Sequence, residues 1–156
     1  MARRKKSTAK KYDMLVKAKG TSSRILEIGQ GSIRMETASK GKANGKFYSG
    51  THWDTVESTI QPDGTAQMNV KYIHMTNKGE MVVGTGTAIQ QPAANPRGIA
   101  RFTGGGTMWT SSSRLSQLNG ARWTCEGDYD MIREAVEVRG TFDLSTTTTT
   151  ATATTD

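Results

Sequence analysis

The stretch that decides the fold runs from Phe47 to Phe102 and reads FYSGTHWDTVESTIQPDGTAQMNVKYIHMTNKGEMVVGTGTAIQQPAANPRGIARF. It contains three segments of alternating character, separated by the turn sequences QPDG at 61–64 and TNKG at 76–79. Alternation interrupted by turns of this kind is typical of strands joined as antiparallel hairpins. The stretch therefore predicts a β meander.

The segment 65–75 has the clearest alternation. One face is expected to carry Ala66, Met68, Val70, Tyr72 and His74, and the other Gln67, Asn69 and Lys71. Since successive side chains of a strand point to opposite sides, the first set is predicted to face the interior. Tyr72 and His74 are then the polar groups placed among apolar ones.

The same pattern extends in both directions from the meander. Strands are predicted at 23–28, 47–60, 80–89, 98–110, 121–129 and 134–144, and 32–36 continues the first of these after a bulge or turn. Residues 12–18 fit either a helical turn or an edge strand. Residues 37–46 (TASKGKANGK) have no large apolar side chain and are predicted to form a loop, and 111–119 a short helical turn with a serine cap, closed by Gly120.

About seven or eight strands and almost no helix indicate an all-β protein. Glycine recurs inside the predicted strands, at Gly50, Gly84, Gly86 and 104–106, where it suits bulges and sharp coiling. A single closed antiparallel barrel of about eight strands is favoured over a two-sheet sandwich, because closure removes exposed edges. Such a barrel has room for side chains or one small ligand.

The chain of 156 residues has the size of one domain, predicted here to span 12–144. Residues 1–11 hold six of the 21 basic residues and no acidic one, whereas the rest is nearly neutral. A disordered basic arm that includes Arg3, Arg4, Lys5 and Lys6 is expected, either binding nucleic acid or another anionic surface weakly or only adding solubility. Residues 145–156 (STTTTTATATTD) are predicted to be a disordered tail.

Several protein classes are excluded or disfavoured by simple features. With Cys125 alone there is no intramolecular disulfide framework. No apolar run follows the basic N-terminus, so neither a signal peptide nor a membrane-spanning helix is expected, and a cytoplasmic location is predicted. The sequence Gly84-Thr85-Gly86 lacks the further glycine and the following helix of a phosphate loop, so no cofactor is expected.

The two histidines give the sharpest constellation in the sequence. If the turn at 61–64 joins a hairpin, residues 51–54 pair near 73–75, which brings His52 and Asp54 close to His74. These groups could act as general acids and bases, with Tyr72 and Glu57 as further catalytic candidates, or as a weak metal site. The alternative is a pair of partly exposed histidines at the end of a hairpin.

A second set of candidates would contact a ligand rather than react with it. Inward aromatic side chains of a small barrel either fill its core or line a pocket. The ligand-binding candidates are Trp53, Met68, Trp109, Trp123 and Tyr129. Cys125 shares a face with Trp123 and is interpreted as a buried thiol rather than a nucleophile.

The sequences FTGGGT at 102–107 and SRLSQLNG at 113–120, followed by an aromatic-rich strand, resemble a glycine-rich pattern of the allene-oxide-cyclase-like barrel group. That group includes plant allene oxide cyclases and dirigent proteins. The resemblance covers about 47–142, and Gly84–Gly86 and Trp53-Asp54 fit it loosely. It implies a calycin-like barrel, often a homo-oligomer, with an apolar cavity. In dirigent-type proteins acidic cavity residues matter; Asp54, Glu57 and Glu80 are the candidates here.

Two functions follow from these features. The first is a barrel that binds an apolar small molecule, acting as a cofactor-independent cyclase or isomerase. The alternative is a noncatalytic structural or accessory barrel that assembles through its outer face, with its basic arm on nucleic acid or another anionic partner.

Overall fold

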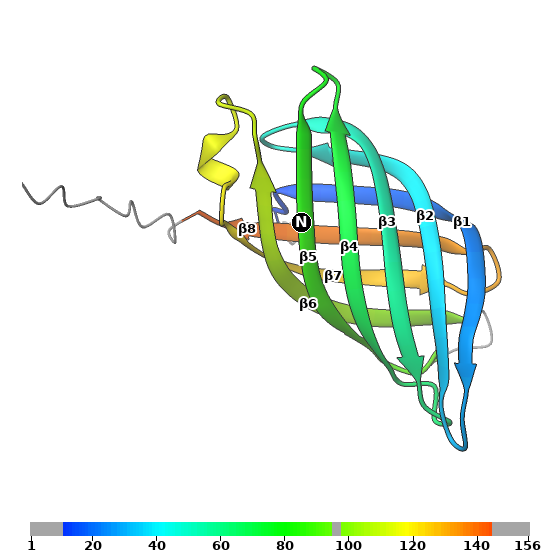
Figure 1. Ribbon diagram of the computed structural model, residues 1–156. Helices are drawn as coiled ribbons and strands as arrows, with labels where there is room; N and C mark the ends of the chain where they lie inside the picture. The colour runs from blue at the N-terminus through cyan, green and yellow to red at the C-terminus, as the bar shows by residue number, and fades with distance from the viewer. Residues whose placement is uncertain (1–10, 95–97, 145–156) are drawn as a thin grey trace, which may run out of the picture.

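The protein forms a closed barrel of eight antiparallel strands, seen in a computed structural model that describes residues 11–94 and 98–144 (Figure 1). The predicted arm, with Arg3, Arg4, Lys5 and Lys6, lies outside these residues except for Lys11, and so does the predicted tail at 145–156. The strands are β1 (Met14–Ile28), β2 (Ile33–Gly45), β3 (Ser49–Ile60), β4 (Ala66–Thr76), β5 (Met81–Gln90), β6 (Ile99–Thr110), β7 (Arg122–Asp130) and β8 (Ala135–Asp143).

Each strand pairs with the next one along the chain, and β1 closes the barrel on β8. The closing ladder runs from the pair Met14–Gly140 to the pair Lys19–Ala135. The all-β closed barrel is therefore confirmed, and the sandwich is excluded. No helix in the described part of the chain is both long and apolar enough to cross a membrane.

The first two strands correct the sequence interpretation. Residues 14–18 and 23–28 belong to one strand, β1, and residues 37–45 are not a loop but most of β2. This part of β2 lacks large apolar residues, and its inward positions are occupied by Ser39, Gly41 and Ala43. A Cβ atom on Gly41 would lie 2.0 Å from the carbonyl oxygen of Lys17, so the two strands approach too closely for a side chain there.

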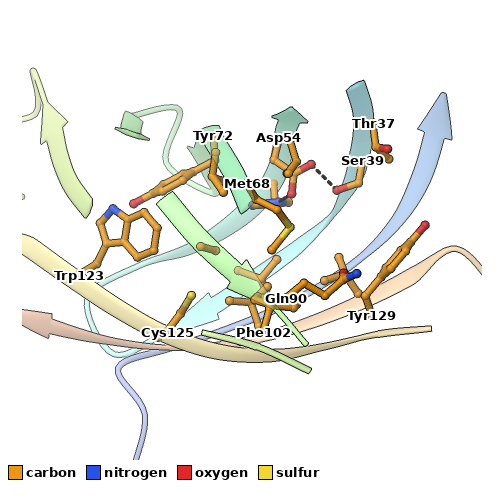
Figure 2. Close-up of a pocket in the computed structure, with 18 of the residues that line it drawn as sticks. Thr37, Ser39, Asp54, Met68, Tyr72, Gln90, Phe102, Trp123, Cys125 and Tyr129 are labelled. Atoms are coloured by element: carbon orange, nitrogen blue, oxygen red, sulfur yellow. Dashed lines mark hydrogen bonds and ion pairs between the residues drawn. The ribbon is translucent and has the colours of Figure 1, made fainter. Parts of the chain in front are cut away.

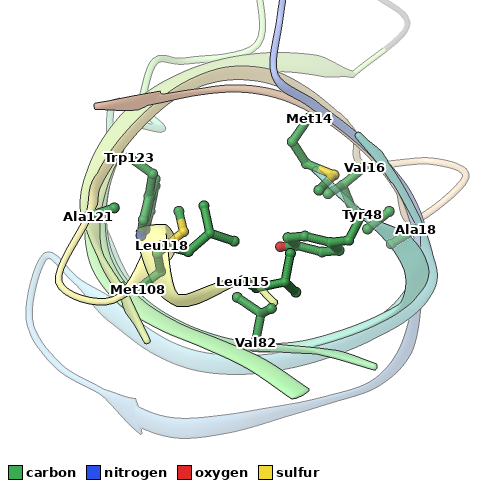
Figure 3. Packing of buried hydrophobic residues seen from close by; sticks show 11 residues of the cluster. Met14, Val16, Ala18, Tyr48, Val82, Met108, Leu115, Leu118, Ala121 and Trp123 are labelled. Carbon is green, nitrogen blue, oxygen red and sulfur yellow. The ribbon is translucent and has the colours of Figure 1, made fainter. Parts of the chain in front are cut away.

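One end of the barrel is closed by the segment between β6 and β7 and is called the plugged end. Its 3₁₀ turn, η1 (Ser116–Leu118), places Leu118 in the core, and Leu115 lies beside it, both at most 1% exposed (Figure 3). The expected serine cap is wrong, since Leu115 holds the cap position without a side-chain hydrogen bond. Gly120 does close the segment, with a φ of +69°.

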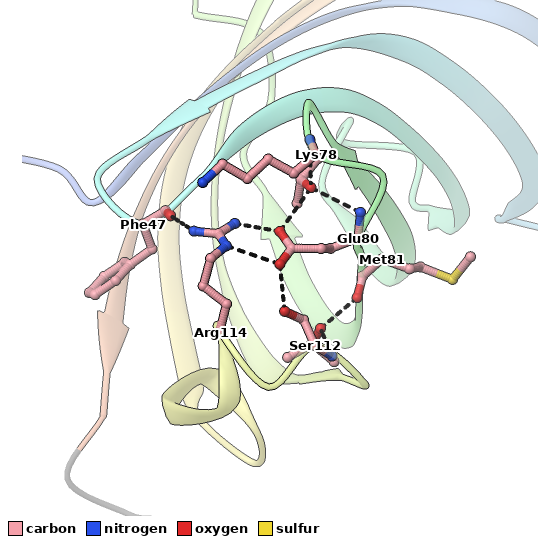
Figure 4. Close-up of polar contacts among 8 residues, drawn as sticks. Phe47, Lys78, Glu80, Met81, Ser112 and Arg114 are labelled. Atoms are coloured by element: carbon pink, nitrogen blue, oxygen red, sulfur yellow. Dashed lines mark hydrogen bonds and ion pairs between the residues drawn. The ribbon is translucent and has the colours of Figure 1, made fainter.

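An ion pair fixes this plug to the β4–β5 turn. The Glu80 carboxylate accepts hydrogen bonds from the Arg114 guanidinium and from Ser112 Oγ, the latter at 2.7 Å (Figure 4). These donors lower the pKa of Glu80 to about 2. Glu80 thus holds the plug and lines no cavity, in contrast to the role that the family resemblance left open for it.

Two glycines of β5 make room for aromatic rings inside the barrel. A Cβ atom on Gly84 would lie 2.3 Å from the Tyr72 ring, and one on Gly86 would lie 2.4 Å from the Trp123 indole. The two rings therefore pack closely against bare backbone, and any side chain at these glycines would displace them. These contacts place Tyr72 and Trp123 side by side, with ring centroids 5.9 Å apart.

Candidate functional site

The barrel encloses a cavity of about 170 Å³ between the plugged end and the far end of the strands (Figure 2). One wall, from β2, β3 and β4, carries polar groups, among them Ser39, His52, Asp54 and His74. The opposite wall, from β6, β7 and β8, is mostly apolar and includes the aromatic side chains of Phe102, Trp123, Tyr129 and Phe142. The cavity therefore offers an apolar surface facing a small set of convergent polar groups.

A continuous chain of hydrogen bonds runs through the polar wall. Tyr48 Oη lies 2.6 Å from His74 Nδ1, and His74 Nε2 lies 2.8 Å from His52 Nδ1. His52 Nε2 lies 2.8 Å from one oxygen of Asp54, and Ser39 Oγ lies 2.6 Å from the other. Both histidines are at most 5% exposed. We call these five residues the histidine relay.

The register of three strands creates this relay. His52 pairs directly with His74 between β3 and β4, as the sequence predicts, and Ser39 pairs directly with Asp54 between β2 and β3. His52 and Asp54 are two residues apart on one strand, so their side chains share its inner face. Tyr48, just before β3, adds its ring from the plugged end.

With both rings neutral, the carboxylate sets the direction of every hydrogen bond in the relay, because it can only accept. His52 then donates from Nε2 to Asp54, and its Nδ1 accepts from Nε2–H of His74. His74 then accepts the Tyr48 hydroxyl proton at Nδ1. Burial, with a smaller contribution from His52, lowers the pKa of His74 to about 3, so this ring is neutral at pH 7, as the pattern requires.

Tyr72 stands between the relay and the aromatic wall. Its ring centroid is 4.7 Å from that of His74 and 5.9 Å from that of Trp123. Burial raises its pKa, so the hydroxyl keeps its proton. In contrast to Tyr48, it has no hydrogen-bond partner among the described residues, which leaves it free to donate to a ligand.

The structure brings together some of the predicted site residues and separates others. His74, Tyr72 and Asp54 line the cavity, and so do Met68, Trp123 and Tyr129. Glu57 does not, because it is three residues from Asp54 and points outward, where it binds Arg34 at 2.5 Å. Trp53 and Trp109 are also on the outer surface, 38% and 44% exposed, so neither can contact a ligand in the cavity.

Two relay residues were missed from the sequence. Ser39 lies in the segment predicted to be a loop, although the alternation of small residues with Lys40 and Lys42 in 39–43 is typical of a strand. No sequence pattern places Tyr48 near His74, since Tyr48 precedes β3 and its side chain reaches His74 at the plugged end of the barrel.

The geometry of this site does not favour metal binding or nucleophilic catalysis by Cys125. Within residues 11–94 and 98–144 no three His, Cys, Asp or Glu side chains are arranged to hold a metal ion, and the ring nitrogens of His52 and His74 already bond each other and their neighbours. Burial raises the pKa of Cys125 to about 11, so its thiol is protonated at neutral pH and a poor nucleophile.

Comparison with known proteins adds information on the fold. No protein-family model and no curated protein matches the chain. A solved protein of unknown function from Clostridium acetobutylicum is similar, at 15% identity with a TM-score of 0.70, over 85% of this chain and 97% of that one. A β-barrel-like protein from Acinetobacter baumannii is similar at 15% identity with a TM-score of 0.71, over 83% and 92%.

A third similar structure is that of an enzyme from Penicillium herquei. It shares 21% identity with a TM-score of 0.58, over 90% of this chain and 99% of that one. These likenesses show a common barrel fold. None of the three is described as a member of the allene-oxide-cyclase-like group.

Proposed function

We propose that the protein binds a small, largely apolar molecule in its cavity and acts on it as a cofactor-independent isomerase or cyclase. The observation that carries this proposal is the buried histidine relay, which ends in a carboxylate on the wall of an apolar cavity. A purely structural core would gain more from apolar side chains than from five connected polar groups.

In this proposal Asp54 is the base. Two hydrogen bonds of the relay, from Ser39 Oγ and His52 Nε2, end on its two oxygens and hold the carboxylate in one orientation. Asp54 would take a proton from a hydroxyl group or an activated carbon of the substrate and return it at another position, which leaves the atom count unchanged. Tyr72 would donate a hydrogen bond to the negative charge that develops in between.

Two further observations support an activity of this kind. A barrel with the same fold from Penicillium herquei is an enzyme, so the architecture can house catalysis. The glycine-rich segment 102–120 also resembles the allene-oxide-cyclase-like group, whose cyclases need no cofactor.

The test uses 2-naphthol, an aromatic alcohol whose fluorescence distinguishes the neutral and ionised forms. We expect it to bind the wild-type protein and to emit as naphtholate, because Asp54 accepts its proton in the excited state. Asp54→Asn keeps the shape and should bind the probe but abolish the naphtholate emission, whereas Val70→Trp fills the cavity and should abolish binding. Equal naphtholate emission from the wild type and Asp54→Asn would refute Asp54 as the base.

A further inference from the structure

The outer surface of strands β2–β6 carries a row of side chains that the cavity does not explain. Direct cross-strand pairs place Lys40, Trp53, Ile73, Val83 and Trp109 next to one another in that order. Trp53, Ile73 and Trp109 are 38–44% exposed. Strands β2–β5 lie side by side across this outer surface in Figure 1. We call this row the tryptophan face.

Lysines border the tryptophan face on its β1–β2 side. Lys17 pairs directly with Lys42, and Lys19 with Lys40, so two like-charged pairs stand together on the outer surface. Like charges placed directly opposite each other destabilise a sheet. Within the part of the chain that the structure describes, Lys17 alone among these four has a carboxylate in reach, that of Glu137 at 3.7 Å.

The barrel is nearly neutral in total, but its charges are unevenly distributed over the outer surface. Acidic residues gather instead on β7 and β8, where the Arg139 guanidinium binds Asp128 and Glu137 at 3.0 and 2.9 Å. The lysines of β1 and β2 form a basic strip between these acidic strands and the exposed aromatic rings. Lys71 is two residues from Ile73 on the same outer side of β4.

We propose that the tryptophan face and its lysines bind single-stranded nucleic acid. Exposed aromatic rings on a barrel offer platforms for bases, and flanking lysines track the phosphates. Three inter-strand spacings of about 4.8 Å put the Trp53 and Trp109 backbones roughly 14 Å apart, which leaves room for bases on both rings. Lys40 Nζ already lies 5.5 Å from the Trp53 ring, so cation and ring stand within reach of one nucleotide.

A second copy of the chain fits this surface less well. Two such faces in contact would bring both sets of lysines together, and like-charge contacts of this kind oppose association. A polyanion can form ion pairs with the lysines, and a nucleic acid can also stack its bases on the tryptophans. An acidic polypeptide would form ion pairs with the lysines but offer no bases for the tryptophans.

The experiment measures binding of a fluorescent oligothymidylate of about 16 nucleotides to the full chain at several salt concentrations. Trp53→Ala should weaken binding about 5- to 150-fold, the measured range for losing one stacked base. Lys40→Gln with Lys42→Gln should reduce the slope of log K against log salt by about 1.4, if both contact phosphates. Tryptophan fluorescence and circular dichroism check that the variants remain folded.

A charge-matched control removes two cations elsewhere. Arg101→Gln with Arg133→Gln changes the same net charge at side chains that are 85% and 82% exposed, away from the tryptophan face. This control should leave the affinity and the salt slope nearly unchanged. An equal effect of both double variants would overturn the proposal, because binding would then depend only on total charge.

Three other outcomes would also overturn it. One is loss of binding only when Arg3, Arg4, Lys5 and Lys6 are replaced by Gln, which would assign binding to the arm. Another is competition by polyglutamate as effective as that by unlabelled oligothymidylate, which would indicate an acidic protein partner. The third is a multimer of the wild type that Trp53→Ala converts to a monomer, which would assign the face to self-association.

Discussion

Acidification should destabilise the protein in a pH range where few other groups titrate, because His74 is buried in its neutral form. Its pKa is about 3 in the folded protein and about 6.5 in an unfolded chain. The unfolded state therefore binds more protons than the folded state between these values, and the stability contributed by neutral His74 is lost as pH falls below 6.5.

The size of the effect follows from the displaced pKa. Each pH unit well inside the window costs about 1.4 kcal/mol of unfolding free energy, so lowering the pH from 7 to 5 should cost about 2 kcal/mol from His74 alone. For a domain of this size, that loss lowers the melting temperature by about 4–8 °C. The Glu80 carboxylate, whose pKa is about 2, adds its own loss only below about pH 4.5, outside this interval.

The assay is urea unfolding at half-unit steps from pH 7 to pH 5, together with NMR of the histidine ring carbons. Stability should fall across the series, and the His74 resonances should not titrate over it. In His74→Gln the loss of unfolding free energy between pH 7 and pH 5 should be about 2 kcal/mol smaller than in the wild type, whatever the absolute stability of the variant. A His74 ring that titrates near pH 6.5 in the folded protein, or a stability that stays constant from pH 7 to 5, would refute the reasoning.

Three further experiments test other contacts. Tyr48→Phe leaves His74 Nδ1 buried without a donor and should cost about 1–3 kcal/mol in urea unfolding, whereas Tyr129→Phe, which removes a hydroxyl near the far end, should cost less than about 0.5 kcal/mol. Arg114→Gln should release the plug from Glu80 and speed hydrogen exchange of the backbone amides in 114–120, with those of β3 unchanged as the reference. Cys125 should react with a maleimide far more slowly than a free thiol at pH 7, and fast labelling of the folded protein would contradict its half-buried position and raised pKa.

Much of the barrel and part of its site could be predicted from the sequence, because strand periodicity and turn chemistry are local signals. The turn at 61–64 fixes the hairpin register, and that register alone places His52 opposite His74. The second strand could not be recognised by apolar content. Its inward positions are occupied by Ser39, Gly41 and Ala43, and at Gly41 the backbone of β1, far away in the sequence, leaves no room for a side chain.

The errors among the site residues have a shared physical cause. Glu57 is three residues from Asp54, and Trp53 is one residue from it, so a strand that turns Asp54 inward must turn both of them outward. Strict use of this period would have removed them from the cavity. Trp109 is harder to place, because the glycines at 104–106 carry no side chains and give no indication of which face the following residues take.

The same two-residue period makes the two proposals independent of each other. On β3, His52 and Asp54 belong to the relay while Trp53 between them belongs to the tryptophan face, and on β4 the residues His74 and Ile73 divide in the same way. Substitutions on one face leave the backbone ladder of the other intact. Asp54→Asn should therefore change the naphtholate emission without changing the affinity for the oligonucleotide. Trp53→Ala should weaken oligonucleotide binding without changing the naphtholate emission. A variant that alters both would point to a change in the strands themselves rather than to either site.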